Sequence, residues 1–184
     1  MKIYLFTLIT ILLLSFVGFG QDINPCKEAD SPIIQGLRLD DSFTDVKKDS
    51  KLKFVSDKKT AGIYYVFNPN KNVFFLMINV YKNHLSIILV SYSNEIKWNF
   101  VAEFRQQVID SLSLSGTWKN TGEYDNQKST LSCENFNIDV DKPDGKFRLI
   151  ASSKVIAKRR HNDILIQTKK EKELQEKKKE TFRP

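Results

Sequence analysis

The middle third of the chain carries short apolar runs of the kind that β-strands require. Three runs rich in aromatic and β-branched residues follow one another at 63–67, 73–81 and 85–92. The asparagine-rich segment 68–72 predicts the first turn, and Lys82-Asn83-His84 predicts a tight second one, because asparagine tolerates the positive φ of hairpin turns. The pattern predicts an antiparallel meander. Its third strand is apolar on both faces, which is typical of a strand inside a sheet.

Helical and further strand patterns flank this meander. A short strand at 33–39 should lead to a helix that begins at Ser42, where the spacing Ser42-Phe43-Thr44-Asp45 resembles a capping box. Apolar residues spaced by three and four predict an amphipathic helix from Asn99, as its N-cap, to Leu112, ended by Ser115-Gly116. Two more strand regions follow, at 129–136 with 137–140, and at 147–152 after a turn at 142–145.

Together these elements predict the α+β class, with an antiparallel sheet packed by one or two helices and a charged helical tail at the C-terminus. The order of helices and strands also allows a tandem arrangement in which a helix-plus-hairpin unit occurs twice. No residue identities between the two halves support this tandem alternative.

The N-terminus has the pattern of a secretory signal peptide. Lys2 precedes fifteen residues, 3–17, without a charge, and Gly18 and Gly20 occupy the small-residue positions of a cleavage site before Gln21. An uncleaved anchor is the alternative, but a spanning helix needs about 20 apolar residues. We therefore expect a signal peptide at 1–20, a globular domain at 21–153, a tail at 154–184, and no transmembrane span after cleavage.

An exported chain can keep a disulfide. Cys26 and Cys133 lie 107 positions apart, and an oxidising compartment would allow them to pair. The alternative is two unpaired thiols, one of them buried. Neither cysteine has a C-x-x-C partner, so a redox or zinc site has little support. A lipoprotein signal is disfavoured because Cys26 follows Pro25 instead of a small residue.

The net positive charge of the mature chain lies in its tail. Residues 21–153 hold seventeen Lys and Arg and seventeen Asp and Glu, whereas 154–184 hold eleven and five. A solvated helix is one reading of this tail, and binding to anionic lipid or another polyanion is the other. The candidate basic patch comprises Lys158, Arg159, Arg160, Lys169, Lys170, Lys177, Lys178 and Lys179. The tail lacks interleaved aromatic residues apart from Phe182, so no specific nucleic-acid partner is expected.

The segment Gly36-Leu37-Arg38-Leu39-Asp40-Asp41-Ser42-Phe43-Thr44-Asp45-Val46 resembles the opening signature G-x-x-L-G-M-T/S-x-x-E-V of the outer-membrane assembly lipoprotein BamE and its relatives. Most of the mature chain also resembles a family of uncharacterised exported bacterial proteins, through a set of spaced residues. These are Tyr92, Trp98, Glu103-Phe104, Leu112-Ser113-Leu114, Trp118, Leu131-Ser132-Cys133, Phe136 and Phe182-Arg183-Pro184. The resemblance implies a helix-on-sheet scaffold for protein contacts in the cell envelope, and it implies no catalytic residue.

The polar residues do not form a recognisable catalytic or metal-binding pattern. His84 falls in a predicted turn and His161 in the charged tail, which are poor positions for a general base. Asp40-Asp41 stands beside a predicted helix start, where we expect capping. The pair Asp139 and Asp141 lacks the twelve-residue calcium-loop pattern. We therefore expect no enzyme activity, no cofactor and no metal.

The aromatic residues are expected to act mainly as core. Tyr92, Trp98, Trp118 and Phe136 should anchor the interior. The sheet also holds many rings for its size, and any that stand exposed together would mark a contact surface. Those rings belong to Tyr64, Tyr65, Phe67, Phe74, Phe75 and Tyr81.

The sequence thus favours a secreted or periplasmic, non-enzymatic module that binds a protein partner or takes part in envelope assembly. The alternative is a protein that docks on anionic surfaces through its basic tail.

Overall fold

The computed structural model describes residues 26, 30–93, 98–122 and 127–181, and it confirms the predicted α+β class. The predicted signal peptide, residues 1–20, lies outside the described residues. In chain order the elements are α2 Phe43–Asp49, β1 Val55–Ser56, β2 Ile63–Asn70, β3 Val73–Tyr81, β4 His84–Tyr92, α3 Val101–Leu112, β5 Trp118–Thr121, β6 Lys128–Ser132, β7 Phe136–Asp141, η2 Pro143–Gly145, β8 Arg148–Ser153 and α4 Lys154–Thr181.

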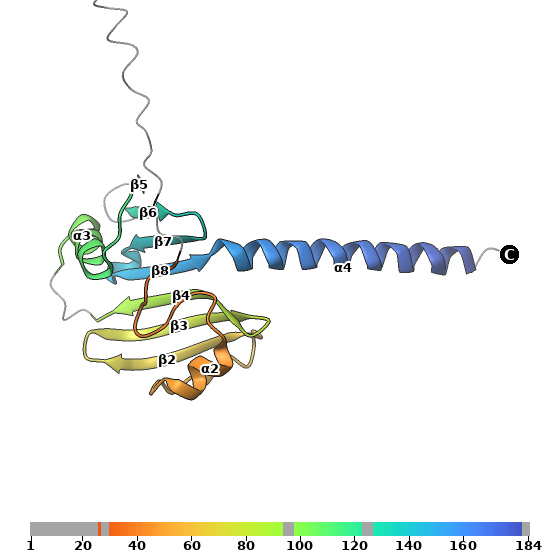
Figure 1. Cartoon of the computed structure of the whole chain (residues 1–184), viewed down its shortest axis with the longest axis horizontal. Coiled ribbons are helices and arrows are strands. Elements are labelled where there is room, and N and C mark those ends of the chain that lie inside the picture. The colour runs from red at the N-terminus through yellow and green to blue at the C-terminus, as the bar shows by residue number, and fades with distance from the viewer. Residues whose placement is uncertain (1–25, 27–29, 94–97, 123–126, 182–184) are drawn as a thin grey trace, which may run out of the picture.

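The described strands form one antiparallel sheet in the order β1-β2-β3-β4-β8-β7-β6-β5 (Figure 1). Each half of the sheet is a four-stranded meander that follows a helix, α2 for the first meander and α3 for the second. Replacing each strand of one meander by its counterpart in the other gives the same strand order read from the opposite edge. An approximate two-fold axis between β4 and β8 would produce this symmetry. The tandem alternative is therefore confirmed, with a four-stranded meander in place of the hairpin.

One face of the sheet forms the core. A row across it holds Tyr64, Ile78, Ile88, Ala151, Ile138, Leu131 and Trp118, and its five central members are fully buried. The ring of Phe43 in α2 lies 4.3 Å from that of Tyr64 at one end of this row. Towards the other end of the sheet, Arg105 of α3 donates hydrogen bonds to Ser129 and Asn120, which belong to the next row on the same face. Both helices therefore cover this face.

The helix boundaries confirm one predicted cap and correct another. Ser42 is the N-cap of α2, and its hydroxyl accepts from the Asp45 N–H. The N-cap of α3 is Phe100, whose side chain makes no capping bond, while the predicted cap, Asn99, donates its N–H to Glu103. The helix ends at Ser113, whose φ of 52° is left-handed, earlier than the predicted Ser115-Gly116.

The predicted strand at 33–39 is wrong. Ile34 and Leu37 exchange two backbone hydrogen bonds across a tight turn, with Gln35 at φ 54° and Gly36 at φ 80°. The apolar residues of this segment do face the core, since Ile34, Leu37 and Leu39 are all buried. The segment is nevertheless not a strand of the sheet. The left-handed conformation of Gln35 and Gly36 forms a turn, which interrupts the extended backbone that the period-two pattern predicted.

The sequence pattern does not predict the short strands β1 and β5, and it predicts the second hairpin turn one residue longer than it is. β1 and β5 consist of exposed or half-buried residues, so neither carries an apolar signal. The predicted strand at 129–136 is divided at Cys133 into β6 and β7. The second hairpin turn is Lys82-Asn83, with φ of 47° and 67°, and His84 already belongs to β4.

The predicted disulfide joins Cys26 to Cys133. Both residues are buried, with exposed fractions of 4% and 2%. Gly116 packs so closely on this bridge, at φ 117°, that a Cβ there would lie 3.1 Å from the Cys26 Cα. The bridge ties the N-terminal segment to the end of β6, and its presence is consistent with an oxidising compartment.

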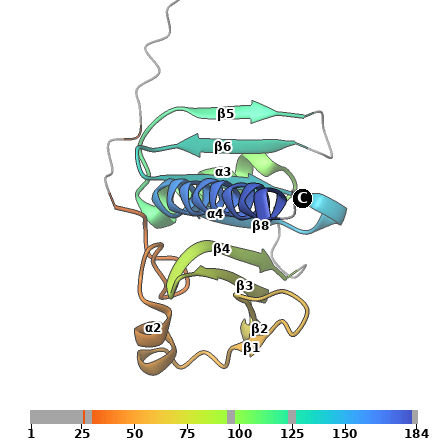
Figure 2. The same cartoon turned by 90° about the vertical axis from the view of Figure 1, so that its right-hand side faces the viewer.

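The predicted tail is a helix along its described length. α4 continues directly from β8 and contacts the sheet only at its base, near β4 and β7 (Figures 1 and 2). Ile156 is buried there, whereas nearly all residues beyond Ile156 are exposed. Within the described part of the chain, no helix combines the length and the apolar character that crossing a membrane would take.

Candidate functional site

The sheet has a second face, opposite α2 and α3, which we call the open face. One of its rows holds Tyr65, Met77, Leu89, Ile150, Asp139, Thr130 and Lys119 from edge to edge. The row beside it holds Phe67, Phe75, Ser91, Arg148, Asp141, Lys128 and Thr121. In both rows the first meander contributes mostly apolar side chains, and the second contributes polar or charged ones except for Ile150. The open face is therefore divided into two chemically different halves.

The apolar half is accessible to solvent. It consists of Ile63, Tyr65, Phe67, Phe75, Met77, Ile87, Leu89 and Ile150, which are half-buried except for Phe67. Phe67 is 62% exposed and stacks on Tyr65 with ring centroids 6.3 Å apart. Phe74 beside it is 43% exposed, in edge contact with Phe75, and Lys146 lies 4.3 Å from its ring centroid. The exposed rings that would mark a contact surface thus gather on this face.

Most charges of the polar half are paired within it, and Lys119 at the β5 edge is the exception among its described residues. Lys128 pairs with Asp139 at 3.0 Å, and Arg148 forms a two-pronged contact with Asp141 at 2.7 and 2.9 Å. The hydrogen bonds that the Arg148 guanidinium donates to Asp141 raise the pKa of that guanidinium. Because Asp139 and Asp141 are paired in this way, their spacing reflects cross-strand ion pairs. Among the described residues, no group of three or more His, Cys, Asp or Glu is placed to hold a metal ion.

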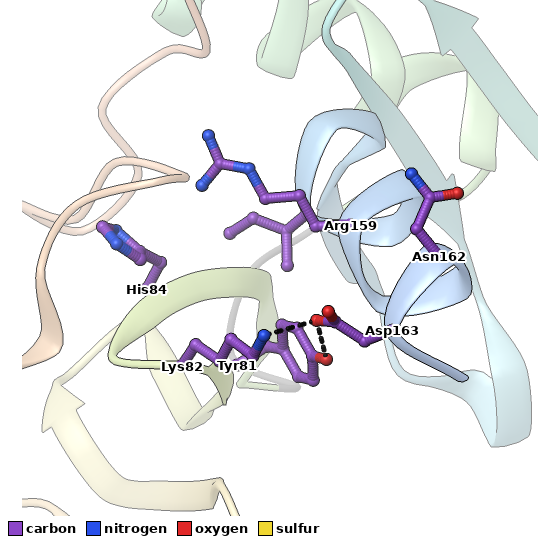
Figure 3. A pocket seen from close by; sticks show the side chains of 7 residues that line it. Tyr81, Lys82, His84, Arg159, Asn162 and Asp163 are labelled. Atoms are coloured by element: carbon purple, nitrogen blue, oxygen red, sulfur yellow. Dashed lines mark hydrogen bonds and ion pairs between the residues drawn. The ribbon is translucent and has the colours of Figure 1, made fainter. Parts of the chain in front are cut away.

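A second candidate lies where α4 leaves the sheet. Asp163 of α4 accepts a hydrogen bond from the Tyr81 hydroxyl at 2.6 Å and forms an ion pair with Lys82 at 2.7 Å (Figure 3). The contact with Lys82, and next the one with Tyr81, lower the pKa of the Asp163 carboxyl. Arg160, which is on α4 like Asp163, lies 6.0 Å from the centroid of the Tyr81 ring. These contacts brace the base of α4 against the β3–β4 hairpin.

Beside this brace is a pocket of about 360 Å³, which we call the junction pocket. Its lining comprises Tyr81, Lys82, His84, Ile156, Arg159, Asn162 and Asp163. Arg159 and His84 lie on different sides of the pocket, and Lys82 lies below them with its ammonium directed at Asp163 (Figure 3). His84 Nδ1 lies 2.9 Å from the Asp40 carbonyl oxygen, and since a carbonyl only accepts, Nδ1 carries the proton.

A second hollow, of about 730 Å³, lies on the covered face between α3 and the turn at Ile34. Its floor is the aromatic cluster in which the Phe104 ring lies 4.6 Å from Trp98 and 5.2 Å from Tyr92. Of the residues that line it, only Lys71 and Tyr92 carry an ionisable side chain. The hollow is therefore an apolar groove without convergent acid–base groups.

Burial of Tyr92 in this cluster raises its pKa to about 12. An unfolded tyrosine ionises near 10, so the folded state holds the proton more tightly. Stability from this source is complete below pH 10 and is lost as the pH rises toward 12. We expect the free energy of unfolding to fall by about 2 kcal/mol between pH 9 and 11.5 from this residue. Urea denaturation should show a smaller fall for Tyr92→Phe, and equal falls in both proteins would contradict the assignment.

The structure separates the predicted tail patch into two groups. Lys158, Arg159 and Arg160 lie at the base of α4, where Arg159 lines the junction pocket together with Lys82. Lys169, Lys170, Lys177 and Lys178 lie farther along α4 among glutamates, and Lys169 pairs with Glu173 at 4.0 Å. The side chain of Lys179 lies outside the described part of the chain. The eight residues therefore do not form one patch.

The other predicted residues are placed as follows. Phe136 is buried, and Tyr92, Trp98 and Trp118 pack against the core as expected. Neither Asp40 nor Asp41 caps α2, because Asp40 accepts from the Ser153 hydroxyl and Asp41 from the Arg38 N–H. His161 lies exposed on α4.

Sequence reasoning missed the junction pocket altogether. Arg159 was assigned to a diffuse basic tail, and His84 to a turn. Nothing in the local sequence around either residue indicates that both line one pocket. They do so because β4 pairs with β8 and β8 continues directly into α4.

Comparison of the chain with known proteins found no matching family model, no matching curated protein and no matching solved structure.

Proposed function

We propose that this chain is an exported, non-enzymatic binding or envelope-assembly module that acts through protein–protein contacts on the open face. The observation that carries the proposal is the apolar half, a contiguous group of aliphatic and aromatic side chains left accessible over β2, β3, β4 and β8. Large exposed apolar patches on soluble domains mark interaction sites, because covering them removes apolar area from water.

The division of the open face supports a partner of matching character. The apolar half offers rings and aliphatic chains without charge, while in the polar half four of the five charged residues form internal pairs and Lys119 does not. A protein surface with an apolar centre and a polar rim on one side would complement both halves. Exposed aromatic residues such as Phe67 are the type of side chain that dominates interface energies.

The test begins with a photoreactive phenylalanine analogue placed at Phe67, in cells that export the chain. Phe100 is a matched control position, because it is 66% exposed and lies at the start of α3, away from the open face. We expect one defined crosslinked protein from position 67 and none from position 100. A crosslink between two copies of this chain would contradict an envelope partner.

The recovered partner is then titrated against the purified chain and its variants. Phe67→Ser should weaken binding about tenfold or more, because an exposed aromatic side chain at an interface centre contributes at least about 1.4 kcal/mol. Phe100→Ser should bind like the unsubstituted chain. Equal affinities of the two variants would rule out the open face as the contact surface.

A second candidate function is docking on an anionic surface through the tail. The observation that favours it is the group of cations at the base of α4, where residues 154–160 hold Lys154, Lys158, Arg159 and Arg160 without an acidic residue.

A further inference from the structure

The charges of α4 are arranged differently at its base and beyond it. Residues 154–163, the base, hold four Lys or Arg and one acid, Asp163. Residues 164–178 hold Lys169, Lys170, Lys172, Lys177 and Lys178 against Glu171, Glu173 and Glu176. The base therefore carries the denser positive potential, and it is also the part of the helix that the sheet holds in place.

The one acid of the base is already engaged. Asp163 is bound by both Tyr81 and Lys82, so its negative charge is compensated within the brace. Arg159 lines the same pocket and makes no ion pair with any acid among the described residues. With Lys82 and Arg159 on the pocket and Arg160 and Lys158 on the same two helical turns, the positive groups exceed Asp163 in number.

From this arrangement we propose that the junction pocket binds a phosphate-class anion through Arg159 and Lys82, beside His84. This proposal narrows the second candidate function to one site and rests on it. The guanidinium of Arg159 offers a planar pair of donors suited to phosphate oxygens, and Lys82 supplies a point charge. His84 lines the same pocket, so its backbone amide can report on binding there.

The geometry favours a defined site over diffuse attraction. Tyr81, Asp163 and the buried Ile156 fix the base of α4 relative to the hairpin, so the distance between the pocket's two sides is set by the fold. The volume of about 360 Å³ falls in the range of small-ligand pockets, about 300–1,000 Å³. There is room for the group that carries the phosphate, which is either a lipid headgroup or a soluble phosphorylated compound.

The first experiment titrates the disulfide-bonded chain with inorganic phosphate, followed by amide and guanidinium NMR shifts at ionic strength held constant with NaCl. Two variants each remove an adjacent pair of cations from α4. Arg159→Gln with Arg160→Gln changes the base, and Lys169→Gln with Lys170→Gln is the matched control. We expect saturable shifts at Arg159 and His84 and about a tenfold loss of phosphate affinity in the base variant only. Equal losses in both variants, or no saturable shift, would overturn the proposal.

The second experiment separates the two sources of phosphate and uses the same variants. Vesicles of phosphatidylglycerol are compared with vesicles of phosphatidylcholine in sedimentation binding. Retention on phosphatidylglycerol that the base variant loses supports the site with a lipid headgroup as its ligand. Phosphate binding without vesicle retention supports it with a soluble ligand. Retention that only the Lys169 and Lys170 variant loses would refute the junction pocket while leaving tail docking intact.

Discussion

Removal of the Cys26–Cys133 bridge is expected to lower the free energy of unfolding by about 4–5 kcal/mol, the value for closing a loop of this length. The bridge spans 107 positions, so it restricts most of the unfolded chain. It also ties Cys26, near the start of the described chain, to the end of β6. Since domain stability is about 5–15 kcal/mol, the reduced chain should be close to unfolding at 37 °C.

The measurement is urea denaturation of the unsubstituted chain beside the double variant Cys26→Ala and Cys133→Ala. Reduced and alkylated chain serves as a second comparison, since it removes the cross-link with the cysteine backbone positions unchanged. A mass difference on alkylation, seen only after reduction, establishes that the bridge forms in the exported protein. A double variant within about 1 kcal/mol of the unsubstituted chain would show that the cross-link contributes little.

The first meander could be predicted because its strands carry strong local signals. Aromatic and β-branched residues fill β2 to β4, and Asn83 at φ 67° provides the turn residue that the pattern required. β5 could not be found in this way, because Trp118 is its only large apolar residue and its other positions are exposed. It exists through its register with β6, which is a tertiary contact.

The candidate surfaces depend on tertiary information to a greater degree. The ring-rich strands predicted that some rings would stand exposed together, but not which ones. That choice follows from the side on which α2 and α3 pack, which leaves Tyr65 and Phe67 open while Tyr64 and Val66 are covered. The junction pocket was less predictable still, since α4 had first to be placed beside the hairpin.

The two meanders share a topology but differ in the use of the open face. Position by position, Tyr65 and Met77 of the first half correspond to charged or hydroxylated residues such as Asp139 and Thr130 of the second. The central strands keep mostly apolar side chains on the covered face in both halves, and two polar residues there, Ser129 and Asn120, bind Arg105 of α3. The difference between the halves is therefore largest on the open face, which favours a role in binding for that face.

The attachment of α3 to the sheet rests on Phe104. This side chain is 1% exposed, and its ring lies within 5.2 Å of the rings of Tyr92, Trp98 and Phe147. Phe104→Ala would leave a cavity at the centre of that cluster, because the three surrounding rings cannot all move in to fill the space of the removed ring. We expect a loss of about 3–5 kcal/mol in the free energy of unfolding.

Phe100→Ala is the matched control for this substitution, since Phe100 is 66% exposed one turn earlier and should change stability by less than about 0.5 kcal/mol. Urea denaturation of both variants, with the bridge intact, compares the two losses directly. Similar values would mean that α3 is held by its polar contacts, such as Arg105 to Ser129, and not by the aromatic cluster. Because Phe104 lies on the covered face, a folded Phe104→Ala chain should still bind a partner through Phe67. Loss of that binding without unfolding would place the contact surface on the helix side of the sheet.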